Sequence, residues 1–229
     1  MKKPVVDYRG LRLSTVTQPQ YRHLLLLLGW VVYFLLYVLT ENLIPAEKCY
    51  PVHGRLDDLI PFCEWFVIPY VGWYALIVFS LGYFLLYNVE NFKGLQTYII
   101  ITQAIAMTAY ILFPTRQDLR PEVLPRDNFL TDIVAILYSA DTNTGVCPSL
   151  HVGYSLGIAS AWLKERSASP LGKTAAVFFV VMVCLSVAFV KQHSVVDIYA
   201  AIPMCLVAEF FAFRPYYKNR RAAKLSHSA

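Results

Sequence analysis

The amino-acid sequence predicts an all-α integral membrane protein: a bundle of about six transmembrane helices with both termini in the cytoplasm. Hydrophobic residues make up 57% of the 229 residues and charged residues only 15%, whereas about 25% of an average soluble domain is charged. Aromatic residues reach 15%, which is typical where Tyr and Trp anchor helices at both membrane interfaces. Several uncharged runs also approach the roughly 20 residues that cross a bilayer.

Four uncharged runs carry the strongest signal for transmembrane helices. They are residues 24–40, 65–87, 95–114 and 174–190. Each is close to the length needed to cross about 30 Å of hydrocarbon. No small-residue cleavage site follows the first run, so a retained helix is expected in place of a signal peptide.

Two weaker segments complete the six predicted spans. Residues 149–163 contain a histidine and several small residues, and residues 195–213 carry Asp197 and Glu209. Small residues favour close helix packing inside a bundle, and an ionisable group at membrane depth is a candidate functional residue. Residues 116–148, which separate the run 95–114 from the weaker segment 149–163, are expected to form a long loop.

The distribution of lysine and arginine predicts the orientation. With six spans both termini share one side, which then carries 14 basic residues against 6 on the other. The positive-inside rule places the richer side in the cytoplasm. The chain is therefore divided into a basic cytoplasmic segment (1–23), a six-span domain (24–213) and a basic cytoplasmic tail (214–229). A multi-pass protein of the plasma or inner membrane is expected.

The net charge of +5 is explained by this topology. Basic tails on the cytoplasmic side suit the anionic headgroups of membrane lipids. Membrane lipids are therefore expected partners, and nucleic acid is not.

Three polar clusters lie at predicted helix ends, and the topology places all three on the non-cytoplasmic side. They are residues 113–121, 147–151 and 191–197. Convergence of such clusters from separate parts of the chain is typical of an active site at the rim of a helical bundle.

The third cluster contains a candidate nucleophile. His193 and Asp197 are four residues apart, so they share a face of a helix. A carboxylate there can hold the imidazole in one tautomer and stabilise its cationic form, which leaves the other nitrogen free to attack. Histidine can itself serve as a covalent nucleophile. His151, from a different helix, could protonate a leaving alkoxide as a general acid.

The remaining residues of the clusters are candidates for binding a phosphate. Pro148 suits the first turn of a helix, where free backbone amides and the Ser149 hydroxyl could hold the anion. Arg116, Arg120 and Lys191 could neutralise the charge on the phosphoryl oxygens during transfer.

Each feature also has a simpler explanation. The HxxxD pair could be a polar contact between helices, the Pro-Ser pair only a helix start, and the arginines a solvated loop face. Two histidines and Asp197 could instead bind a metal ion, but no third histidine lies at helical spacing, so no metal and no cofactor are expected. The five cysteines show no zinc spacing, and Cys49 and Cys63 could pair if their loop is extracytoplasmic.

Taken together, the motifs resemble those of the type 2 phosphatidic acid phosphatase superfamily. The residues that carry the resemblance are PSLH at 148–151 and KQHSVVD at 191–197, with an apolar run between them. The resemblance implies that His193 is the nucleophile of a phosphohistidine intermediate, that Asp197 is its partner and that His151 protonates the leaving group. It also implies a lipid phosphate substrate and no requirement for a metal ion.

Within residues 110–200 the chain departs from the superfamily pattern at three positions. Arg120 and the proline after it match the end of the first motif, but Phe113 stands where the superfamily has lysine. Val187 replaces the arginine of the last motif, and Leu150 replaces the glycine of the middle one. These variations resemble the branch that contains inositol phosphorylceramide synthases.

Three functions remain open from the sequence. The first is a lipid phosphatase that hydrolyses a lipid phosphate or diphosphate. The second is a lipid phosphotransferase of the inositol phosphorylceramide or sphingomyelin synthase type, which passes the phosphoryl headgroup to an alcohol. The third is a channel or transporter in which the same polar residues line a path. Basic residues gathered around two histidines favour the enzymes.

Overall fold

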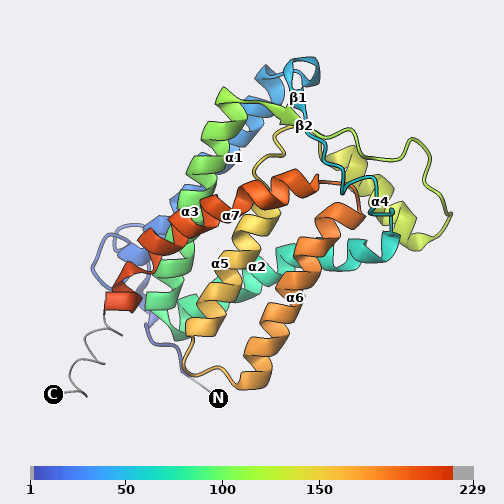
Figure 1. Cartoon of the computed structure of the whole chain (residues 1–229). Helices are drawn as coiled ribbons and strands as arrows, with labels where there is room; N and C mark the ends of the chain where they lie inside the picture. Colours follow the sequence, from blue (N-terminus) through green and yellow to red (C-terminus); the bar gives the residue numbers. More distant parts are fainter. Residues whose placement is uncertain (1–2, 219–229) are drawn as a thin grey trace.

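The computed structural model describes residues 3–218 and is mostly helical (Figure 1). Its α-helices are α1 (Leu28–Leu43), α2 (Val67–Tyr87), α3 (Val89–Leu112), α4 (Phe129–Ala140), α5 (Leu150–Lys164), α6 (Pro170–Phe189) and α7 (Val195–Ala212). Strand structure in the described part of the chain is limited to β1 (Tyr50–Pro51) and β2 (Thr115–Arg116), which pair in parallel. The helical class is therefore confirmed. Lys2 and most of the predicted tail, including Arg220, Arg221 and Lys224, lie outside the described residues.

Five helices are long and apolar enough to cross a membrane. They are α1 with the 3₁₀ turn Arg22–Leu27 before it, α2 with the turn Glu64–Phe66 before it, α3, α6 and α7. They correspond to five of the six predicted spans. Phe34 on α1 and Val78 on α2 are 55% and 72% exposed. Rows of exposed apolar side chains are stable only in an apolar solvent, as expected of a membrane-embedded protein.

The sixth predicted span forms α5, the helix at the centre of the bundle. It has 15 residues and contacts α2, α3, α6 and α7. Most of its side chains are buried, and its glycines allow close packing. A β-carbon at Gly157 would lie 2.5 Å from the Tyr98 ring, and one at Gly153 would lie 2.9 Å from Met204. The low hydropathy of this segment follows from contact with protein instead of lipid.

The expectation that residues 116–148 form a loop is wrong over α4. Asn128 begins this helix with a capping box: its side chain accepts hydrogen bonds from the N–H groups of Leu130 and Thr131, while its own N–H donates to the Thr131 hydroxyl. The helix has 12 residues, well below the roughly 20 of a span. A search for long apolar runs therefore does not detect it.

The N-terminal ends of α5 and α7 meet at one end of the bundle. The backbone N–H of Ser149 donates to the carbonyl of Asp197 at 3.2 Å. The segment that leads out of α4 runs directly into α5 at the same end, and α1 lies alongside α3 at one edge (Figure 1). This arrangement brings residues from the three polar clusters to one end of the molecule.

Candidate active site

The start of α7 holds the histidine–aspartate pair: Asp197 lies in the first turn, and His193 immediately precedes the N-cap residue Ser194. Ser194 caps the helix, and its backbone N–H donates to Asp197 Oδ2 at 3.0 Å. The same oxygen lies 3.2 Å from His193 Nδ1, so the contact predicted from the i,i+4 spacing is present. Asp197 is fully buried. A carboxylate fixed in this way favours the tautomer that carries its proton on Nδ1 and leaves Nε2 free.

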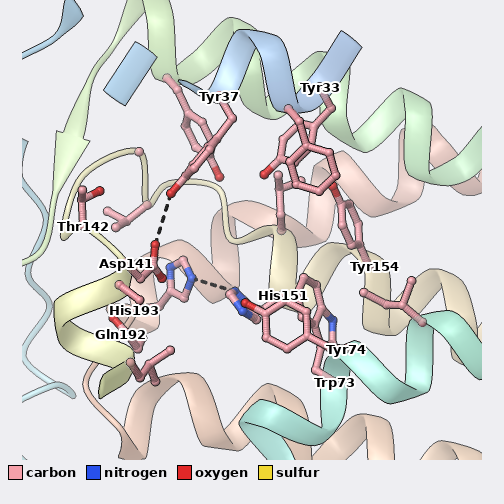
Figure 2. A pocket seen from close by; sticks show the side chains of 18 of the residues that line it. Tyr33, Tyr37, Trp73, Tyr74, Asp141, Thr142, His151, Tyr154, Gln192 and His193 are labelled. Carbon is pink, nitrogen blue, oxygen red and sulfur yellow. Dashed lines mark hydrogen bonds between the residues drawn. The ribbon is translucent and has the colours of Figure 1, made fainter. Parts of the chain in front are cut away.

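His151 faces this free nitrogen from the first turn of α5. Its Nδ1 lies 3.4 Å from His193 Nε2 (Figure 2). Its ring packs against the rings of Tyr70 and Trp73 from α2, at centroid distances of 4.6 and 4.2 Å. Two nitrogens that face each other from separate segments of the chain can act on the same reacting group.

Ser149 connects the two helices and does not line the cavity beside the histidines. Its side chain is fully buried, and its hydroxyl accepts a hydrogen bond from the N–H of Val152 at 3.5 Å. The carbonyl of the preceding Pro148 accepts a hydrogen bond from the Tyr110 hydroxyl at 2.7 Å. The start of α5 is thus held by α3 and α7, and this fixes the direction of His151.

Two of the three predicted phosphate-binding cations are engaged elsewhere. Arg116 forms an ion pair with Asp118 at 3.0 Å and donates to the carbonyl of Cys49 at 3.1 Å. Lys191 donates to the carbonyl of Asp57 at 2.9 Å and to a second carbonyl of the same loop. Neither residue lines the cavity beside the histidines.

Arg120 lies between the end of α4 and the segment before α7. Its guanidinium donates to the carbonyls of Tyr138, Asp141 and Thr142, and to the side-chain oxygen of Gln192 at 2.6 Å. Burial lowers the pKa of Arg120, and Asp141 opposes this effect. In this structure the arginine joins two segments of the site wall to each other.

Asp57 is a site residue that sequence reasoning missed. It is buried, and its Oδ1 accepts a hydrogen bond from the N–H of Val195 at 2.8 Å. Its Oδ2 accepts from the Ser194 hydroxyl at 2.5 Å and from the N–H of Gly54 at 2.7 Å. A carboxylate is stabilised at a helix N-terminus by free amides and the helix dipole. No spacing rule predicts a contact between residues 137 positions apart.

A cavity of about 590 Å³ lies beside the two histidines. Such a volume is within the range of small-ligand sites. Its walls come from α1, α2, α5 and the segment after α4, and most of its side chains are aromatic or apolar (Figure 2). Phe34 and Val78 line it and are also largely exposed on the outer surface. The cavity therefore reaches the apolar surface of the bundle between α1 and α2.

Asp141 is a second residue that sequence reasoning missed, because it stands outside all three clusters. It follows α4, lines the cavity and accepts a hydrogen bond from the Tyr37 hydroxyl at 3.2 Å. Burial raises the pKa of Asp141, while His193 and Arg120 act against the increase. Among the cavity-lining residues in the described part of the chain there is no lysine or arginine.

The sequence allows a metal site at the histidines and a disulfide between Cys49 and Cys63. Over residues 3–218, no group of three or more His, Cys, Asp or Glu side chains is placed to hold a metal ion. All five cysteines, Cys49 and Cys63 included, are free thiols.

No family model matches the chain, and no curated protein or solved structure is significantly similar to it. The likeness to the phosphatidic acid phosphatase superfamily is therefore carried by the short motifs alone.

Proposed function

We propose that the chain is a membrane enzyme that transfers the phosphoryl group of a lipid phosphoester through a phosphohistidine at His193. In its simplest form the acceptor is water, and the enzyme is a metal-independent lipid phosphatase. The strongest support comes from two successive contacts: Asp197 contacts His193, and His193 contacts His151. A buried carboxylate, an imidazole with one free nitrogen and a second imidazole facing that nitrogen are the groups that this chemistry needs.

In the first step, His193 Nε2 attacks phosphorus and the P–N bond forms as the bond to the leaving oxygen breaks. Asp197 holds the proton on Nδ1 and stabilises the positive charge that develops on the ring. His151 donates a proton to the leaving oxygen. In the second step, the acceptor hydroxyl loses its proton to His151 and attacks phosphorus, the P–N bond breaks and His193 is regenerated.

The cavity supports a lipid as the substrate. A headgroup near the histidines would continue into hydrocarbon chains, and the apolar cavity wall that includes Phe34 and Val78 suits such chains. We place the site on the non-cytoplasmic side of a plasma or inner membrane. On α5, His151 lies at the opposite end from Lys164, and the positive-inside rule assigns the lysine end to the cytoplasm.

One observation favours the second candidate, transfer to an alcohol. The cavity contains the carboxylate of Asp141 and, among the described residues that line it, no lysine or arginine. A phosphatase for doubly charged lipid phosphates would be expected to hold cations there.

The experiment is turnover of a panel of lipid phosphoesters by the purified protein in detergent micelles. Phosphate release that His193→Ala abolishes supports the phosphatase, and a new phosphodiester without matching phosphate release supports the transferase. His53→Ala is the matched control, because that histidine is about half exposed and pairs with Asp58 away from the cavity. Turnover that survives His193→Ala would contradict the mechanism. Absence of any turnover, together with solute flux that survives the same substitution, would indicate a channel.

A further inference from the structure

We propose that the substrate of this site is a zwitterionic phosphodiester lipid, whose headgroup ammonium is bound by Asp141. This inference depends on the proposed function, because it takes the reacting phosphorus to lie at His193. It assigns a role to Asp141, which the three-residue mechanism does not use.

The charges around the cavity favour a phosphodiester over a phosphomonoester. A monoester carries between one and two negative charges near neutral pH, and sites for such groups gather arginine and lysine around the oxygens. Here Arg116 and Lys191 are held by carbonyl groups outside the cavity, and Arg120 donates to carbonyls and to Gln192. The Asp141 carboxylate would repel a second negative charge, since like charges in a partly dry site interact strongly.

Neutral donors are available for a singly charged phosphodiester. Trp73 and Gln192 line the cavity and are 7% and 3% exposed. The indole N–H of Trp73 and the amide nitrogen of Gln192 have no hydrogen-bond partner among the described residues. Buried donors of this kind are normally satisfied in proteins, so an unpaired one beside a cavity indicates a ligand or a water molecule.

The surroundings of Asp141 suit a cation. Figure 2 shows Asp141 on one side of His193 and His151 on the other. The Tyr37 hydroxyl donates to Asp141 Oδ1, and the rings of Tyr33 and Tyr74 line the same cavity. A carboxylate binds an ammonium group through charge, and aromatic rings elsewhere in the cavity wall add cation–π attraction. A headgroup whose phosphorus lies at His193 would therefore extend its ammonium toward Asp141. The glycerol oxygen then lies on the His151 side and takes the proton of His151, so the P–O bond to diacylglycerol breaks and the phosphorylated headgroup is the group held on His193.

The test compares wild-type protein with Asp141→Asn, which keeps the shape of the side chain and removes its charge. Substrates are phosphatidylethanolamine, phosphatidylcholine, phosphatidylglycerol and phosphatidic acid in mixed micelles. We expect kcat/KM for the two ammonium lipids to fall by about tenfold or more in Asp141→Asn, mainly through KM. Turnover of phosphatidic acid should stay constant or rise, because a repulsive charge has been removed. Asp127→Asn, an exposed aspartate of the loop before α4, is the matched control.

Three results would overturn the inference. One is an equal loss on all four lipids, which would indicate a role for Asp141 in proton transfer or in folding, and thermal unfolding in the same micelles separates those two. Another is a wild-type preference for phosphatidic acid. The last is turnover of phosphatidylglycerol that equals turnover of the ammonium lipids. A different result would contradict the proposed function itself: wild-type protein and His193→Ala would consume each of the four lipids at the same rate.

Discussion

α5 and α7 carry a polar cluster at each end, and the two clusters differ in how completely they are satisfied. At the end of the bundle opposite the histidines, Lys164 Nζ lies 2.6 Å from Glu209 Oε1, and Glu209 Oε2 accepts a hydrogen bond from the Ser160 hydroxyl at 2.7 Å. The lysine also lies 4.2 Å from the centre of the Phe213 ring. None of these residues lines the cavity.

The cluster at the histidine end is incomplete by comparison. Asp197 Oδ1 and His151 Nε2 have no hydrogen-bond partner among the described residues, and the cavity lies directly beside the two histidines. A buried polar network that is fully paired stabilises a particular packing, whereas one with unused groups beside a cavity is suited to chemistry. The same two helices therefore combine a paired end, called the structural end below, with the end that holds the proposed site, called the reactive end below.

The largest expected effect is at the reactive end. Asp197→Asn removes the charge that stabilises the imidazolium and disturbs the tautomer of His193. Activity should fall by about 10²–10⁴-fold, as for the equivalent change in other histidine–aspartate pairs. Steady-state turnover of the preferred lipid measures this, and thermal unfolding should change little. A loss of activity that only follows a loss of folded protein would show that Asp197 is structural.

At the structural end, Glu209→Gln should have the opposite profile. It leaves Lys164 buried without its counter-ion, and we expect about 1–3 kcal/mol of lost stability, since the carboxylate is about a quarter exposed. Activity per folded molecule should not change. Thermal unfolding in micelles checks the first expectation, and turnover normalised to folded protein checks the second. A change in KM would show that the two ends are coupled.

Asp57→Asn should have an intermediate effect, because this residue holds the reactive end in place without lining the cavity. Weakening its bonds to the start of α7 should lower kcat by up to about tenfold with KM unchanged, and should cost about 1 kcal/mol of stability. Asp58→Asn is the control, since the neighbouring aspartate forms its ion pair with the exposed His53. Equal effects of the two substitutions would contradict the role of Asp57 in holding the start of α7.

The smallest effect concerns pH. An ordinary aspartate has a pKa of about 3.9. Burial raises the pKa of Asp141, so its carboxylate becomes protonated at a higher pH than that of an ordinary aspartate. Binding of an ammonium headgroup is complete above this raised pKa and is lost as the pH falls through it. KM for phosphatidylethanolamine should therefore rise on acidification in wild-type protein and less so in Asp141→Asn. Arg120 and His193 face the same carboxylate, and the comparison of the two proteins isolates the part of the pH dependence that comes from Asp141.

The parts of the fold that the sequence predicts are those set by local pattern. Long uncharged runs identify four helices, α1, α2, α3 and α6, and the two weaker segments identify α5 and α7 although they contain small or ionisable residues. The contact between His193 and Asp197 is also predicted from their spacing, although His193 precedes α7 and reaches the carboxylate across the helix N-cap and not along a helix face. The short helix α4 is missed because its signal is a capping box and not a long run.

Side-chain direction in loops is the part that the sequence does not predict. Arg116 and Lys191 stand in the right clusters, but carbonyl groups of a distant loop hold their side chains. Asp57 and Asp141 reach the site through tertiary contacts with α7 and α1. Such contacts depend on how the helices pack, which residue spacing does not encode.

The opening of the cavity between α1 and α2 determines how the concentration of a substrate must be counted. A lipid that reaches His193 through this opening diffuses within the bilayer and never enters water. Its effective concentration is then its mole fraction among the surrounding lipids. Diluting the membrane with an inert lipid would slow the enzyme at constant total substrate, and adding more of the same vesicles would not speed up each enzyme molecule.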